Sequence, residues 1–237
     1  MTRELTVEAS GCRLFVQDWG GDGPPLLLLH GGGADVSTWD GLAPLLARDF
    51  RVVAYDARGH GQSEVPASGG RASLLEDVDA VIAALELDRP LLVGHSMGGA
   101  TAVRYACGGG CCGVVCIDGA IVRTDEPITH ADPDEYRAKL REFGVPEAHV
   151  EFFFDLRISG EELAAKETVA IYDDIRCPLL LLFAERGMTN LGPYTDRQRA
   201  AIAALRVPTR WFDTGHGIHE ERPDEVAAAI HGFAATL

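Results

Sequence analysis

Five short apolar runs without polar alternation constrain the fold of this chain more than any other feature. They lie at residues 26–29, 52–55, 91–93, 114–117 and 179–183. Strands that are apolar on both faces are typical of a parallel sheet covered by helices on each side. Segments with helical spacing of apolar residues separate or follow these runs, at 74–85, 97–106, 195–205 and 224–235. This order predicts an α/β fold with a mostly parallel, doubly wound sheet.

Two further patterns complete the predicted architecture. Residues 5–9 and 13–19 alternate more clearly and predict an antiparallel hairpin at the sheet edge, and residues 209–212 form a short last strand. From 120 to 174 there is no buried-type strand, but prolines, charges and an aromatic run. We therefore expect a core of residues 1–119 and 175–237, with a small helical cap, 120–174, inserted after the sixth strand.

Charge and composition exclude several classes of partner. The 237 residues carry 21 Lys and Arg against 36 Asp and Glu, a formal net charge of −15. Such acidity argues against nucleic acid and anionic membrane surfaces, and no apolar run approaches the ~20 residues that span a bilayer. No leader-like apolar stretch follows Met1. We expect a cytoplasmic protein, a monomer or small homo-oligomer, whose six cysteines are reduced thiols without a metal.

A sharp turn with a serine at its apex follows the third of the apolar runs. Gly94-His95-Ser96-Met97-Gly98 joins the 91–93 strand to the helix predicted from residue 97. G-x-S-x-G between a strand and a helix places the serine Oγ at the helix N-terminus, where a developing anion is stabilised. The alternative is a glycine-rich turn with a capping serine. Ser96 is the predicted nucleophile.

Glycines after the first apolar run offer free backbone donors. His30-Gly31-Gly32-Gly33 follows residues 26–29, and no phosphate-binding glycine pattern surrounds it. A tetrahedral oxyanion needs two donors about 3 Å away, and we assign them to the N–H groups of Gly32 and Met97. His30 is interpreted as a hydrogen-bonding residue of the loop.

The predicted general base is a histidine that follows the last strand. Thr214-Gly215-His216-Gly217 lies on a loop from which His216 can reach across the strand ends to Ser96. The alternative is a structural loop histidine. Among the competing histidines, His95 is expected to point away from the pocket, and His219 to be a rim or capping residue.

These motifs together resemble the α/β-hydrolase fold superfamily. The resemblance rests on residues 30–33, Asp56-Ala57-Arg58-Gly59-His60-Gly61-Gln62-Ser63, the turn at Ser96 and Gly215-His216, in this order. It implies that the 56–63 segment is structural and that the cap lies within 120–174. Relatives place an aspartate where this chain has Gly187, so the triad acid is Asp118 or Glu185. We prefer Asp118, although aspartate at that strand end can also be purely structural.

The predicted function is that of a serine hydrolase that needs no cofactor. A serine nucleophile implies an acyl-enzyme, formed from a carboxylic ester, lactone or thioester as small-molecule substrate. The cap aromatics indicate an apolar substrate part, unless they only pack the cap down; they are Tyr136, Phe143, Phe152, Phe153 and Phe154. Two alternatives stay open. The same triad serves C–C bond hydrolysis, cofactor-free peroxidation or acyl transfer in relatives, or the chain is a non-catalytic small-molecule-binding member.

Overall fold

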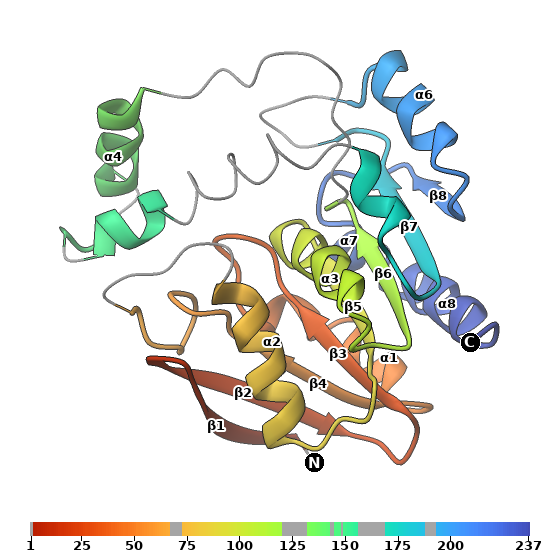
Figure 1. The fold of residues 1–237 in the computed structure, drawn as a ribbon, viewed down its shortest axis with the longest axis horizontal. Helices are drawn as coiled ribbons and strands as arrows, with labels where there is room; N and C mark the ends of the chain where they lie inside the picture. Colours follow the sequence, from red (N-terminus) through yellow and green to blue (C-terminus); the bar gives the residue numbers. More distant parts are fainter. Residues whose placement is uncertain are drawn as a thin grey trace.

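One eight-stranded sheet organises the protein in a computed structural model, which describes residues 2–66, 73–119, 132–142, 145–147, 149–155, 169–187 and 193–237. The strand order is β1-β2-β4-β3-β5-β6-β7-β8; β2 runs antiparallel to both β1 and β4, and every other neighbouring pair is parallel (Figure 1). The strands are β1 (Arg3–Ala9), β2 (Cys12–Gly20), β3 (Pro25–Leu29), β4 (Arg51–Tyr55), β5 (Leu91–His95), β6 (Gly113–Ile117), β7 (Leu179–Ala184) and β8 (Thr209–Phe212).

Every strand expected from the sequence is present, and the four predicted helices are present with them. Those helices are α2 (Ser73–Ala84), α3 (Met97–Cys107), α6 (Asp196–Ala204) and α8 (Pro223–Ala234). The other helical elements are η1 (Val36–Trp39), α1 (Ala43–Leu46), α4 (Pro133–Glu142), η2 (Val169–Asp173) and α7 (Ile218–Glu221). The predicted mostly parallel α/β sheet, with helices on both faces, is confirmed.

The apolar runs of the parallel strands are divided between two hydrophobic layers. In β3, Leu27 and Leu29 face a layer shared with α2 and α3, whereas Leu26 and Leu28 face a layer shared with α1 and α8. Because successive strand residues point to opposite faces, a strand buried on both sides must be apolar throughout. This explains why the runs lack alternation, and it fixes their carboxyl ends along one edge of the sheet.

The loop after β4 is held by buried polar contacts. Asp56 accepts hydrogen bonds from the N–H groups of Val36 and Gln62, each at 2.7 Å. The Arg58 guanidinium pairs with Asp77 of α2 at 2.6 Å, and both side chains are buried. These contacts give the 56–63 segment a structural part, as the resemblance implies.

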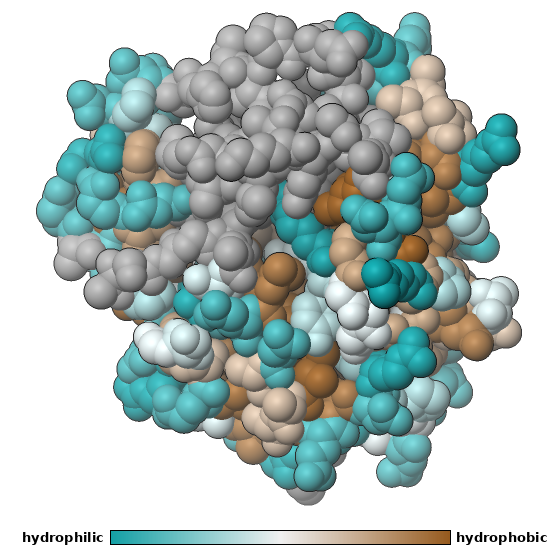
Figure 2. All heavy atoms as spheres, in the orientation of Figure 1, coloured by the Kyte–Doolittle hydropathy of each residue, from teal (hydrophilic) through white to brown (hydrophobic). Residues whose placement is uncertain are grey.

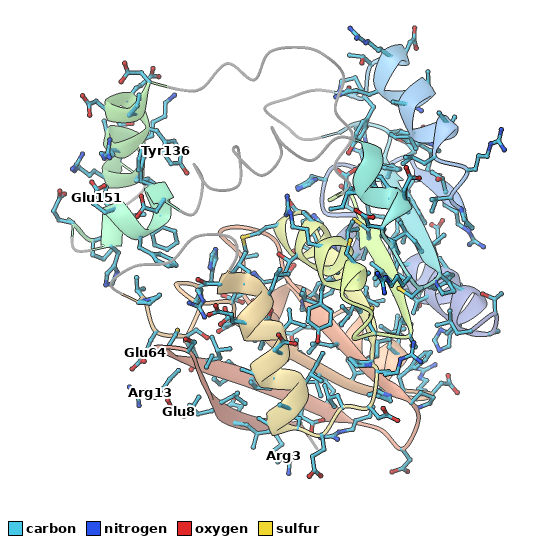
Figure 3. The ribbon with its side chains drawn as sticks, viewed as in Figure 1. Arg3, Glu8, Arg13, Glu64, Tyr136 and Glu151 are labelled. Atoms are coloured by element: carbon cyan, nitrogen blue, oxygen red, sulfur yellow. The ribbon has the colours of Figure 1, made fainter. Side chains whose placement is uncertain are left out.

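The described parts of the 120–174 insertion are helical. α4 stands apart from the sheet beside the helical residues 149–155, and Arg137 joins the two through Glu151 at 2.9 Å (Figures 1 and 3). Tyr136 contacts the Phe154 ring, with 6.4 Å between centroids. Residues 120–131 and Phe143 lie outside the described residues, so the domain boundaries stay a prediction.

The phenylalanines that follow Glu151 pack against the protein. Phe152 is buried, and a Cβ added at Gly59 would lie 2.1 Å from its ring. Phe153 meets the His60 ring edge-on at 5.7 Å, and the Arg137 guanidinium covers Phe154 at 3.6 Å. For these rings the structure favours packing over the substrate contact that the sequence suggested.

Charged and polar side chains occupy much of one face of the protein. Figure 2 shows teal residues on this face with brown and pale areas between them. Among the described residues, the exposed large hydrophobic side chain is Leu237, at 48%. At the β1–β2 hairpin, for example, the Arg13 guanidinium pairs with Glu64, and both side chains are exposed (Figure 3). In the described part of the chain, no helix combines the length and apolar character that crossing a membrane requires.

Candidate active site

A strained serine stands where β5 ends and α3 begins. Ser96 has φ 51° and ψ −114°, a left-handed backbone that a residue with a side chain rarely adopts. The turn needs glycine on both sides: a Cβ at Gly94 would lie 2.3 Å from the Gly98 carbonyl oxygen, and one at Gly98 would lie 2.2 Å from that of Leu29. The half-buried Ser96 is thus held at the carboxyl end of β5, and its N–H donates to the Ile117 carbonyl at 2.9 Å.

The glycine loop after β3 lies directly against this turn. A Cβ at Gly31 would lie 3.3 Å from the Ser96 Cβ, and one at Gly32 would lie 3.8 Å from the Met97 sulfur. Met97 is the first residue of α3, so its N–H has no acceptor within the helix. The structure therefore brings Gly32 and Met97 together beside Ser96. Two donors to one oxyanion must lie close together in this way.

His216 and Asp118 form a hydrogen-bonded pair at the same edge. The Nδ1 of His216 lies 2.6 Å from Oδ2 of Asp118, although 98 positions separate them in the chain. A carboxylate can only accept, so Nδ1 carries the proton and Nε2 keeps its lone pair. The Asp118 side chain is 1% exposed and that of His216 is 22% exposed, so solvent reaches the imidazole but not the carboxylate.

The alternative acid, Glu185, lies apart from this pair. It is exposed at the end of β7, and its N–H donates to the Phe212 carbonyl at 2.8 Å. Gly187 has φ 64°, a left-handed conformation that favours glycine. Of the two carboxylates that the sequence left open, Asp118 is the one that contacts His216.

The other oxygen of Asp118 has its own donors. Oδ1 accepts from the Tyr194 hydroxyl at 2.9 Å and from the Ala184 N–H at 3.2 Å. Tyr194 was not anticipated from the sequence, because no motif surrounds it and it meets Asp118 only through the parallel pairing of β6 with β7. Its half-buried ring lies beside Phe183 and Trp211.

Two further histidines pack behind His216. His95 is buried, and its Nε2 donates to the His216 carbonyl at 3.0 Å; the two ring centroids are 4.5 Å apart. The prediction that His219 is a rim or capping residue is wrong. Its side chain is fully buried, with its ring 4.4 Å from that of Trp39 and its Nε2 2.9 Å from the Thr38 hydroxyl.

Burial keeps these inner histidines neutral. Burial, reinforced by the neighbouring imidazoles, lowers the pKa of His95 to about 3 and that of His219 to about 4. His30 has the structural part expected of it: its Nε2 accepts from the Ala57 N–H at 2.9 Å and its Nδ1 donates to the Gly31 carbonyl at 2.7 Å. Burial lowers the pKa of His30 to about 4.

Comparison with known proteins identifies the family of this fold. Residues 26–229 match the model of the alpha/beta hydrolase family. The chain belongs to this family. An alpha/beta hydrolase places its nucleophile on a strand-to-helix turn and its histidine on a late loop, which is the arrangement of Ser96 and His216.

Curated relatives are similar over only part of their length. A non-heme chloroperoxidase of Streptomyces lividans is 37% identical over 100 residues, 41% of this chain and 36% of the relative. Protein phosphatase methylesterase 1 of Mus musculus is 44% identical over 94 residues, 37% of this chain and 24% of the relative. The shared region is thus a minor part of each relative.

Solved structures have a similar fold over nearly the whole length of this alpha/beta hydrolase. A putative aryl esterase from Burkholderia cenocepacia gives a TM-score of 0.71 at 25% identity, covering 99% of this chain and 98% of the other. An enol-lactonase from Burkholderia xenovorans LB400 gives 0.74 at 22% identity, with 98% and 100% covered. The second likeness shows the fold alone.

Proposed function

We propose that the protein is a serine hydrolase that cleaves a carboxylic ester, lactone or thioester through an acyl-enzyme. The observation that carries this proposal is the 2.6 Å contact between His216 and Asp118, at the strand edge that also carries the strained Ser96. A carboxylate behind the imidazole fixes its tautomer and stabilises the imidazolium that forms when it takes a proton.

The proposed reaction needs only groups that lie at the carboxyl ends of the parallel strands. The Nε2 of His216 takes the Ser96 proton while Oγ attacks the substrate carbonyl carbon, and the N–H groups of Gly32 and Met97 stabilise the oxyanion. The imidazolium then returns the proton to the departing alcohol or thiol, which leaves an ester on Ser96. Water, deprotonated by His216, attacks this ester, releasing the acid and restoring the serine hydroxyl.

The solved relatives support the class of reaction and do not narrow the choice of substrate. An esterase and a lactonase both have this fold, and both names describe acyl transfer to water. Ser96 is half-buried and the His216 side chain is 22% exposed, so neither proposed reacting group is sealed from a small substrate. Because Phe152, Phe153 and Phe154 are engaged in packing, the proposal of an apolar substrate part rests on the composition of the cap and not on contacts of these rings.

A second candidate uses the same acyl-enzyme with a different acceptor. The local likeness to a non-heme chloroperoxidase favours hydrogen peroxide in place of water. Peroxide would then attack the Ser96 ester, giving a peracid and the free hydroxyl. For the non-catalytic alternative, the supporting feature was the glycine at position 187, and Asp118 now supplies a carboxylate at His216.

Covalent labelling tests the proposal directly. A fluorophosphonate probe is expected to label the protein, and Ser96→Ala is expected to abolish labelling together with hydrolysis of p-nitrophenyl acetate. Ser10→Ala, at an exposed serine in the β1–β2 turn, is the control and should leave both unchanged. Labelling that persists in Ser96→Ala would remove Ser96 from the mechanism. Peracid formation, measured with peroxide in the assay, separates the second candidate from hydrolysis.

A further inference from the structure

We infer that Tyr194 is a positioning residue of the site: its hydroxyl holds the Asp118 carboxylate in the orientation in which Oδ2 faces His216. This inference rests on the proposed function, in which Asp118 serves the imidazole. Tyr194 lies at the N-terminus of α6, after β7, and no sequence motif marks it. Its part in the site follows from three contacts of one carboxylate.

The two oxygens of Asp118 have separate partners. Oδ2 faces His216 Nδ1 at 2.6 Å, while Oδ1 takes the Tyr194 hydroxyl at 2.9 Å and the Ala184 N–H at 3.2 Å. A carboxylate turns about its Cβ–Cγ bond unless both oxygens are engaged. The Tyr194 contact is the shorter of the two on Oδ1, and hydrogen bonds to a charged acceptor are strong ones. Tyr194 therefore shares with the Ala184 N–H the restraint against this turn.

Tyr194 is itself held by aromatic packing rather than by a flexible chain. Its ring meets Phe183 of β7 edge-on at 5.2 Å and Trp211 of β8 at 5.5 Å. Phe183 and Trp211 stack at 4.9 Å, and the Arg199 guanidinium covers Trp211 at 4.0 Å. The Tyr194 hydroxyl therefore reaches Asp118 from a ring that is packed against side chains of β7 and β8.

The hydroxyl stays a donor at every working pH. Burial raises the pKa of Tyr194 well above its usual value, and the adjacent Asp118 carboxylate raises it further. The phenol therefore keeps its proton while the carboxylate is ionised, so the direction of the hydrogen bond does not change.

Tyr194→Phe removes this one hydrogen bond and keeps the aromatic contacts. We expect kcat to fall roughly tenfold, with KM changed by less than about twofold. The variant frees the Asp118 carboxylate to turn but leaves the substrate-binding groups in place. The matched control is Tyr105→Phe, which removes a similar bond, from the Tyr105 hydroxyl to Asp79 at 2.7 Å, on an exposed surface. The control should keep the activity of the wild type.

Proton NMR distinguishes positioning from a general effect on folding and does not require turnover. The Nδ1 proton of His216 shared with Asp118 should give a far-downfield resonance, assigned by its loss in His216→Gln. In Tyr194→Phe this resonance should weaken, because the carboxylate that shares the proton is no longer held in one orientation. Tyr105→Phe should show no such change.

The outcomes separate this inference from the proposed function. An unchanged resonance in Tyr194→Phe would overturn the positioning role, whatever the enzyme's activity. If the wild type neither labels nor turns over, the proposed function fails, and the NMR comparison still decides the role of Tyr194.

Discussion

The imidazole of His95 donates from Nε2 to the backbone carbonyl of His216 at 3.0 Å, across 121 positions of the chain. His95 directly precedes the serine of the sharp turn, so this bond ties the turn to the loop that carries the proposed base. The carbonyl can only accept, so the bond also fixes the tautomer of His95 with its proton on Nε2. The residue that the sequence analysis set aside thus joins the two halves of the site.

Loss of this bond should lower turnover without weakening substrate binding. His95→Phe keeps a ring between His216 and His219 but removes the donor, and we expect kcat to fall about tenfold, because the imidazole is no longer held in register with Ser96. His95→Gln, which restores an N–H donor, should recover part of the loss. Steady-state kinetics on p-nitrophenyl acetate measures both. His231→Phe, at a surface histidine paired with Asp49, is the control. Equal loss in His95→Gln and His95→Phe would show that the hydrogen bond is not the cause.

The two candidate acids should differ sharply when each is neutralised. Asp118→Asn removes the charge behind His216 and is expected to lower kcat by about three to four orders of magnitude, as loss of the acid does in other triads. Glu185→Gln, at an exposed side chain, should change kcat by less than about twofold. Parallel assays of the two variants make the comparison. A larger loss in Glu185→Gln than in Asp118→Asn would reverse the assignment of the acid.

The buried histidines should make the protein sensitive to mild acid. The pKa of His30 and of His219 is about 4 and that of His95 about 3, against 6.5 in an unfolded chain. As pH falls below 6.5, the unfolded state takes up protons that the folded state does not, so the free energy of unfolding decreases. Each site contributes about 1.4 kcal/mol per pH unit below 6.5, until its folded pKa is reached.

Urea unfolding at pH 7.5 and pH 5.5 measures this loss. Three such sites are expected to lower the free energy of unfolding by about 4 kcal/mol between the two conditions. His219→Phe, which keeps the ring contact with Trp39, should reduce the difference by about one third, whereas Ser10→Ala, which removes no titratable group, should not. A difference that is the same in His219→Phe and the wild type would contradict the assignment.

Gly119 should tolerate no side chain, because it lies against the serine turn. A Cβ at this position would lie 2.2 Å from the Ser96 carbonyl oxygen. Gly119→Ala is therefore expected to lower the free energy of unfolding by about 1–3 kcal/mol and to impair probe labelling of Ser96. Gly232→Ala is the matched control, since a Cβ there meets nothing within 4 Å in α8, and it should stabilise by about 0.5–1 kcal/mol. Thermal unfolding of both variants checks this, and a stable, fully labelled Gly119→Ala would refute it.

The sheet was predictable from the sequence because its strands are buried on both faces. Runs such as residues 26–29 are apolar without interruption, and each appears as a strand of the observed sheet. The longer helices were predictable because their apolar residues recur every three or four positions, on the face that packs against the sheet. The four-residue elements α1 and α7 were missed, because one turn of helix leaves no periodic pattern to detect.

The site was predictable only where local chemistry marks it. Ser96 lies within a turn that its glycines define, and His216 follows a strand. Asp118 and Glu185 each follow a strand, so only the pairing of β6 with β7 shows which carboxylate reaches the imidazole. The burial of His219 depends on Trp39 and Thr38, from the other end of the chain. Tyr194 similarly acquires its part through tertiary contact alone.

The N–H of Ser96 donates to the Ile117 carbonyl, one residue before Asp118, so the proposed nucleophile and the proposed acid follow neighbouring strands of one sheet. The pairing of these strands restrains the separation of the two residues. The imidazole of His216 lies on the loop between β8 and α7, tethered through His95 and Asp118. Heat or denaturant should therefore inactivate the protein by releasing this loop before the strands separate, and activity should disappear ahead of the circular dichroism of the fold.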